Sequence, residues 1–160
     1  MSASTNKKVI VERFDREPLR GFVAPQSYLQ PAGIELLNTN GNVVAVGYEE
    51  VKAVCFVKDI EGDGLQRARR HFTTRPKSEG LWVRMIFRDG DYLDGLLPNK
   101  LLELDPNGFA VAPPDSAANS QWVFVPRAAL TELKVLGIIG SPLRRRKRLP
   151  PSEDQFELFS

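Results

Sequence analysis

The chain has 160 residues, of which 42% are hydrophobic and 26% charged, and its formal net charge is +2. This composition is typical of a folded globular protein and excludes both general disorder and a membrane-embedded body. The length allows one ordinary domain or two very small ones. Because the net charge is close to zero, a polyanionic partner has to be argued from local clusters of charge.

The sequence offers little material for metal binding or catalysis. Cys55 is the only cysteine and His71 the only histidine, which excludes a disulfide framework and a Cys/His metal site. Cys55 lies in the apolar run 54–57, so we expect a buried thiol that packs as a small hydrophobic group. Residues 1–8 lack the apolar stretch of a secretory signal, and no run reaches the ~18 apolar residues of a membrane span. We therefore expect a cytoplasmic protein without cofactor, metal, membrane partner or enzymatic activity.

An internal repeat organises the chain. The residues that recur 74 positions later are Val9, Asp15, Leu19 and Gly21, as Val83, Asp89, Leu93 and Gly95. The match continues with Gly33-Ile34 against Gly108-Phe109, and with Val51, Val54 and Phe56 against Leu130, Leu133 and Val135. In both copies an apolar strand leads through a tight turn into a Leu-x-Gly sequence. The repeat predicts two copies of one small unit.

Each copy has the pattern of short β-strands. Apolar Val83, Met85 and Phe87 alternate with other residues, which is the period of a half-buried strand. Asp89-Gly90 then predicts a hairpin, because both residues tolerate the backbone angles of a tight turn. Beyond the strands around Val9 and Val83, we expect strands at residues 20–23, 34–37, 43–46 and 52–57, and at 95–97, 109–112, 122–125 and 132–136. A small bent barrel would hide the edges of five such strands.

These patterns predict an all-β protein made of two tandem, strongly bent, five-stranded barrels. The expected first barrel spans residues 7–58 and the second spans 81–140. The segment 59–80 between them is rich in arginine and is expected to be an exposed basic connector. Residues 141–160 hold five consecutive bases and an acidic patch, so we expect a flexible C-terminal tail.

Three segments resemble the signatures of Sm-like proteins. Residues 83–97 resemble the first signature, an apolar strand, an acidic or Gly turn and then Leu-x-Gly. Residues 123–133 and 44–54 resemble the turn that joins the last two Sm strands. The resemblance implies tandem Sm-like barrels, but the turns at 47–50 and 126–129 depart from the loop residues by which Sm-like proteins bind RNA. The whole chain is also similar to an uncharacterised bacterial family of two-repeat proteins.

The C-terminus carries a second resemblance. The segment from Gln155 to Phe159 resembles the peptide that binds the bacterial DNA polymerase sliding clamp, Gln-Leu-(Ser or Asp)-Leu-Phe. Gln155, Leu158 and Phe159 match this pattern, and Phe156 replaces its first leucine. The resemblance implies that Leu158 and Phe159 anchor in an apolar pocket while the Gln155 amide sets the register. The alternative is that Phe156, Leu158 and Phe159 fold back on their own barrel.

Basic clusters are the candidates for nucleic-acid contact, since each Lys or Arg placed at a phosphate releases counterions. The candidates are Arg144, Arg145, Arg146, Lys147 and Arg148 in the tail, and Arg69, Arg70 and Arg75 in the connector. Arg69-Arg70 before a barrel also resembles the start of a cyclic-dinucleotide-binding PilZ domain, but its Asp-x-Ser-x-x-Gly partner is missing. Solvated charged segments are the alternative interpretation of both clusters.

Taken together, the sequence predicts a non-catalytic binding or adaptor protein that is recruited to DNA through a sliding-clamp-binding peptide. One alternative is a tandem Sm-like module that binds RNA. Another is a module for protein or small-ligand interaction whose tail docks on its own body. The candidate partners are the sliding clamp and nucleic acid, the latter bound through the basic tail and connector. The sequence predicts no particular oligomeric state.

Overall fold

The structure is a computed structural model that describes residues 6–99, 104–115 and 118–140. The predicted tail, with its basic run and clamp-like peptide, lies outside these residues. The described part is all-β except for turns, loops and one short 3-10 helix, and it contains no helix long and apolar enough to cross a membrane. The elements are β1 (Lys7–Arg13), β2 (Leu19–Val23), β3 (Gly33–Asn38), β4 (Val43–Gly47), β5 (Val51–Val57), β6 (Gly80–Phe87), β7 (Tyr92–Leu97), β8 (Gly108–Val111), β9 (Ser120–Pro126), η3 (Arg127–Ala129) and β10 (Leu130–Ile139).

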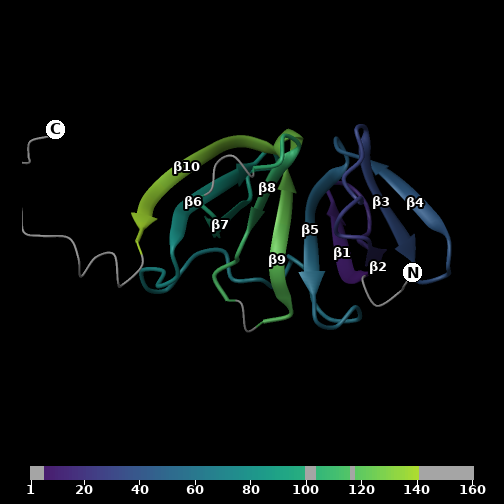
Figure 1. The fold of residues 1–160 in the computed structure, drawn as a ribbon, viewed down its shortest axis with the longest axis horizontal. Coiled ribbons are helices and arrows are strands. Elements are labelled where there is room, and N and C mark those ends of the chain that lie inside the picture. Colours follow the sequence, from purple (N-terminus) through teal and green to yellow (C-terminus); the bar gives the residue numbers. More distant parts are fainter. Residues whose placement is uncertain (1–5, 100–103, 116–117, 141–160) are drawn as a thin grey trace, which may run out of the picture.

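The strands form two antiparallel sheets, shown in Figure 1. A seven-stranded sheet has the order β4-β3-β2-β1-β5-β9-β8, and a three-stranded sheet has the order β10-β6-β7. A bridge connects the sheets, because Leu96 on β7 and Ala112 just after β8 exchange two backbone hydrogen bonds of 3.0 Å. The second half of the chain therefore runs β9-β8-β7-β6-β10 in space.

The two halves repeat one pairing register. Val9 lies opposite Gly21 and Phe56. Val83 lies opposite Gly95 and Val135. The third and fourth strands agree as well, because Gly33 faces Gly47 as Gly108 faces Pro126. Even the irregularity near the start of the fifth strand recurs, in β1–β5 and in β6–β10.

The glycines of the Leu-x-Gly sequences allow close approach between strands. A Cβ atom on Gly21 would lie 2.2 Å from the backbone oxygen of Leu37. A Cβ atom on Gly95 would lie 2.7 Å from the Cβ of Val111. Both contacts are too short for real atoms, so glycine is required where each second strand passes its neighbour.

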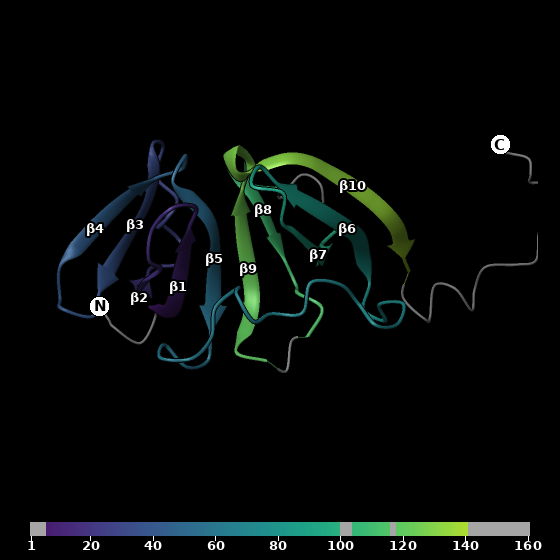
Figure 2. The ribbon, with the colours of Figure 1, turned by 180° about the vertical axis from the view of Figure 1, so that it is seen from behind.

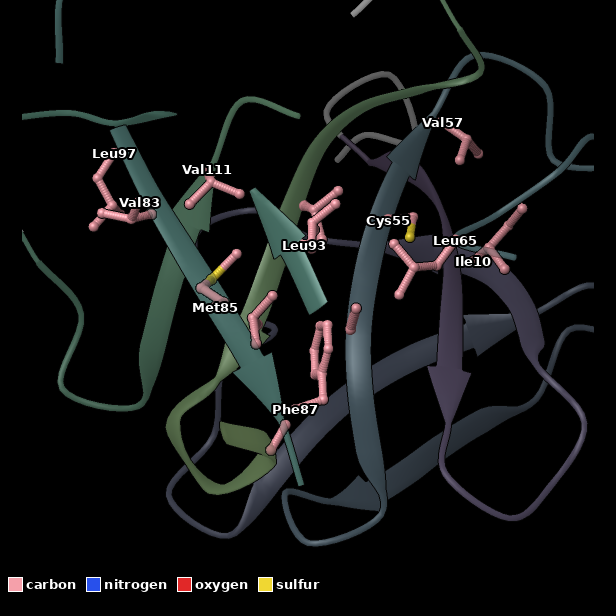
Figure 3. Close-up of a cluster of buried hydrophobic side chains, with 14 residues drawn as sticks. Ile10, Cys55, Val57, Leu65, Val83, Met85, Phe87, Leu93, Leu97 and Val111 are labelled. Atoms are coloured by element: carbon pink, nitrogen blue, oxygen red, sulfur yellow. The ribbon is translucent and has the colours of Figure 1, made fainter. Parts of the chain in front are cut away.

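Two hydrophobic cores lie on opposite faces of β1, β5 and β9. On β5, Val51 and Val54 face the first core, while Ala53, Cys55 and Val57 face the second. The first core consists of Val9, Val11, Val23, Tyr28, Ile34, Leu36, Val46, Val51, Val54 and Phe124. The second, shown in Figure 3, consists of Ile10, Ala53, Cys55, Val57, Leu65, Val83, Met85, Phe87, Leu93, Leu97, Val111, Val123, Val125 and Ala129.

The structure corrects the expectation of two closed barrels. Within the described residues, neither sheet closes on itself. The free edge of β5, which could have closed the first half, is occupied by β9 of the second half. Since the backbone groups on one edge of a strand pair with one neighbour, this pairing places β8 and β9 in the sheet of the first half and leaves both halves open.

The segment 59–80 keeps exposed arginines, among them Arg69 and Arg75, but part of it packs against the folded body. Leu65 is buried in the second core, and its backbone N–H donates to Glu12 Oε2 at 2.9 Å. Arg20 Nη1 donates to the backbone oxygens of Ile60 and Gly62 at 2.6 and 2.8 Å. The segment therefore packs against the folded body, because Leu65 is apolar and its neighbours' carbonyls accept hydrogen bonds from the first half.

Candidate binding groove

A groove lies where the two halves meet, along β5 and β9, which run side by side in the middle of Figures 1 and 2. It has a volume of about 470 Å³. The start of β1, the loop after β2 and the neighbouring strand β8 complete its wall. Its lining residues are Lys7, Lys8, Pro25, Tyr28, Phe56, Val57, Ala110, Gln121, Trp122, Val123 and Phe124.

Aromatic side chains dominate the groove. Tyr28 packs edge-on against Phe56, with ring centroids 5.6 Å apart, and against Phe124, with centroids 6.2 Å apart. Burial, and then the charge of Asp105, raise the pKa of Tyr28 well above its usual value. Trp122 lies opposite Phe56 across the β5–β9 pairing and is 47% exposed. Tyr28, Phe56 and Phe124 therefore form a packed aromatic floor, and the half-exposed indole of Trp122 lies beside it.

The charge along the groove is positive. Lys7 and Lys8 are exposed, and Lys8 Nζ donates to the backbone oxygen of Lys58 at 3.1 Å. Among the described lining residues there is no carboxylate. Gln121 adds an exposed amide that can donate and accept hydrogen bonds. The groove therefore offers the half-exposed indole of Trp122 and the partly exposed ring of Phe56 together with two cations.

A second polar cluster joins the two halves and the connector. Lys52 Nζ on β5 lies 2.9 Å from both Asp89 Oδ2 and Asp91 Oδ2 in the hairpin between β6 and β7. Arg70 Nη2 reaches the same Asp91 oxygen at 2.9 Å, and Arg70 Nη1 donates to the backbone oxygen of Leu65. Although burial lowers the pKa of Lys52, its bonds to the two carboxylates raise it above the usual value.

The carboxylates of this cluster respond in the opposite direction. Burial raises the pKa of Asp91, but hydrogen bonds from Arg70 and Lys52 outweigh it and lower that pKa to about 2. Asp91 is therefore ionised and paired with Lys52 and Arg70. We call Lys52, Arg70, Asp89 and Asp91 the ion-pair cluster. Asp94, fully buried, is held similarly by Arg84, whose Nε and Nη2 lie 2.6 and 3.0 Å from its two oxygens.

The predicted site residues lie apart from the groove. Arg70 belongs to the ion-pair cluster, and its guanidinium donates to Asp91 and to backbone carbonyls. Arg69 and Arg75 are exposed on the connector, beside two shallow hollows of about 90 and 270 Å³. The five bases at 144–148 and the clamp-like residues Gln155, Phe156, Leu158 and Phe159 lie outside the described residues.

The sequence alone did not reveal the groove or the ion-pair cluster. The alternation of β9 places Trp122 next to buried Val123, but only the β5–β9 pairing brings it opposite Phe56. Lys52 is the single base in an apolar strand, which is a signal in the sequence for a partly buried ion pair. Asp89, which the sequence predicts as a hairpin residue, does serve the turn, since the backbone N–H of Asp91 donates to Asp89 Oδ1 at 3.0 Å.

Comparison with known proteins places the chain in a family. A family model described as a family of unknown function, DUF6982, matches residues 5–137. No curated protein and no solved structure matches the chain. The expectation of an uncharacterised family is thereby confirmed. Because the match spans β1 to β9 and most of β10, the chain belongs to the family of unknown function DUF6982.

Proposed function

We propose that the protein is a non-catalytic adaptor that binds single-stranded nucleic acid in the groove between its halves and is recruited to DNA through residues 155–159. The observation that carries the proposal is Trp122, half-exposed beside an aromatic floor and near two lysines. Bases of any sequence stack on aromatic faces, and nearby cations bind the backbone. An aromatic groove with positive charge and no acid among its described lining residues fits such a ligand.

The chemistry of the potential catalytic groups supports a binding role. Cys55 is fully buried, and burial, followed by the charge of Glu12, raises the pKa of its thiol to about 12. Such a thiol is a poor nucleophile at neutral pH. Asp89 and Asp91 are occupied by Lys52 and Arg70. Among the described residues no group of His, Cys, Asp and Glu side chains could hold a metal ion.

The repeated strand order supports the finer proposal that each half is an opened Sm-like unit. In both halves the spatial order is fourth, third, second, first and fifth strand. In this proposal the ligand binds in the groove and not at the turns where Sm-like proteins bind RNA. In those turns Tyr48 Oη donates to the backbone oxygen of Gln30 at 2.6 Å, and Arg127 Cζ lies 4.8 Å from the centroid of the Phe109 ring.

Fluorescence anisotropy with a labelled oligothymidylate tests the groove. Trp122→Ala should weaken binding by about 5-fold to 150-fold, the range for loss of one stacked base. Lys7→Gln with Lys8→Gln should weaken it and flatten its dependence on salt. Val43→Ala, an exposed apolar residue far from the groove, is the matched control. Unchanged affinity in both groove variants would refute nucleic-acid binding at this place, and replacing the oligothymidylate with oligouridylate separates DNA from RNA.

Recruitment to the clamp is a separate proposal that rests on the Gln155, Leu158 and Phe159 pattern. A pull-down with a bacterial sliding clamp should retain the full chain and lose the Leu158→Ala, Phe159→Ala variant, because such anchors carry most of the affinity of a short peptide. Ser160→Ala serves as the control. A lower melting temperature of the double variant, without clamp binding by either protein, would instead select a tail docked on the body. The proposed setting is the cytoplasm.

A further inference from the structure

The molecule has two strands with one unpaired edge each at its opposite ends. Among the described residues, β4 pairs with β3 alone and β10 pairs with β6 alone. Figures 1 and 2 show these strands at the two ends of the long axis, with β5 and β9 between them. Unpaired backbone donors and acceptors make such an edge a template for another strand.

The junction in the middle of the chain shows how these edges fit together. There β5, the fifth strand of the first half, pairs antiparallel with β9, the fourth strand of the second half. The outer edges are their counterparts, since β10 is the fifth strand of the second half and β4 the fourth strand of the first. The operation that carries the first half onto the second would, if repeated, bring β4 of another copy against β10.

The register of that contact follows from the repeated pairing. Val135 corresponds to Phe56, because they face the equivalent residues Val83 and Val9. On the other strand, Val44 and Val123 face the equivalent residues Leu36 and Val111, so Val43 corresponds to Trp122. At the junction Phe56 lies opposite Trp122. The outer counterpart of this pair is therefore Val135 opposite Val43.

Exposure of apolar side chains marks the same two edges. Val43 is 68% exposed and Val135 is 57% exposed. Leu37, next to Val43 on β3, and Leu136 and Ile138 on β10 are exposed as well. Apart from Trp122, these are all the large hydrophobic residues in the described part that are classed as exposed. Apolar, unpaired edges favour association, and neither β4 nor β10 carries a proline.

We propose that β10 of one copy pairs antiparallel with β4 of a second copy, with Val135 opposite Val43, Lys134 opposite Val44 and Leu133 opposite Ala45. The contact is independent of the proposed nucleic-acid and clamp functions. It joins different surfaces of the two copies, so each copy keeps one free edge for the next. Such head-to-tail contacts close into a ring when the rotation allows it and otherwise extend as a filament.

Two charge variants that differ in one sign test this pairing. Like charges directly opposite across two strands repel, whereas opposite charges attract. Val43→Glu with Val135→Glu should therefore be monomeric, while Val43→Lys with Val135→Glu should still assemble and lose assembly as salt increases. Sedimentation velocity over a concentration series measures this, and the wild-type chain should sediment as a multiple of its 17.9 kDa mass. Trp122→Ser is the control that leaves assembly intact.

Several results would overturn the proposal. A wild-type chain that stays monomeric across the series excludes the contact, as does equal assembly of both charge variants. Thermal melts at concentrations too low for assembly separate association from folding, since the substituted residues are exposed and both variants should then have similar stability. Loss of assembly in Trp122→Ser alone would move the interface to the groove.

A cross-link tests the register directly. Residues opposite each other on paired strands have the Cα separation that a disulfide needs, about 4.4 to 6.8 Å. Val43→Cys with Val135→Cys should give a ladder of multimers on a non-reducing gel after mild oxidation. The native Cys55 is fully buried and does not compete. Val43→Cys with Ile138→Cys, which places the thiols out of register, should give far less, and equal yields would contradict the assigned register.

Discussion

The two halves of the molecule share one pairing register but differ in what fills them. The first core draws nine of its ten residues from the first half and takes only Phe124 from the second. The second core borrows Ile10, Ala53, Cys55 and Val57 from the first half and Leu65 from the connector. The two halves therefore share a hydrogen-bond pattern but differ in how far each can fold alone, because the stability of a sheet depends on the side chains that it buries.

Dividing the chain tests this inequality with the largest expected effect. A fragment of residues 6–65 should keep dispersed amide resonances, since it holds nearly all of its own core. A fragment of residues 66–140 should be unfolded, because it lacks the five residues that complete its core. Heteronuclear NMR of each fragment measures the outcome. Mixing the two should restore the spectrum of the second, and a folded second fragment alone would contradict the borrowed core.

The equivalent glycines sharpen the comparison at single positions. A methyl group on Gly21 meets a backbone oxygen at 2.2 Å, whereas one on Gly95 meets a valine side chain at 2.7 Å. Gly21→Ala should therefore cost more, about 3 kcal/mol of the free energy of unfolding against about 1 to 2 for Gly95→Ala. Gly137→Ala, which meets only Trp82 at 3.4 Å, is the control. Urea denaturation measures all three, and equal costs at Gly21 and Gly95 would refute this account.

Acid should weaken the ion-pair cluster that joins the two halves. The pKa of Asp91 is lowered in the folded state from 3.8 to about 2, so its ionised form stabilises the fold at higher pH. That contribution, about 1 to 2 kcal/mol, is complete above pH ~5 and is lost progressively as the pH falls through the folded pKa of about 2. Asp91→Asn should be less stable at pH 7 and show a shallower loss between pH 4 and 2. Asp15→Asn, at an exposed site, is the control, and an unaltered profile for Asp91→Asn would exclude the ion pairs as its source.

The smallest expected effect compares corresponding residues at the inner junction and the outer edge. Trp122→Ser removes a half-buried indole that lies opposite Phe56, so we expect a loss of about 1 kcal/mol. Val43→Ser alters an exposed side chain and should change stability by less than about 0.5 kcal/mol in the monomer. Calorimetric melts at low concentration measure both. A larger cost for Val43→Ser would mean that its edge is already covered within the monomer.

Much of the strand pattern was predictable from the sequence. Alternation placed strands at 34–37 and 52–57, where the structure has β3 (Gly33–Asn38) and β5 (Val51–Val57). The Leu-x-Gly repeat also led to the two positions where strands crowd together. These features are local, because a strand's period and a glycine's missing side chain are written in neighbouring residues.

Closure and the binding site were not predictable in the same way. The choice of β9 as the partner of β5 depends on competition between strand edges far apart in sequence, and no local pattern records it. The groove is a consequence of that choice, since Tyr28, Phe56 and Trp122 come together only across the junction. The packing of the connector was not predictable either, because it depends on Leu65, a single apolar residue among many charged ones.

The position of Cys55 makes the junction chemically readable. This thiol lies on β5 in the shared core, and it is fully inaccessible. An alkylating reagent can therefore reach it only when the fold opens, so the labelling rate, compared with that of an unfolded thiol, reports the opening free energy of this region. At low reagent the rate follows the opening equilibrium, and at high reagent it follows the opening rate itself. The native Cys55 is therefore a probe for the separation of the two halves that needs no substitution.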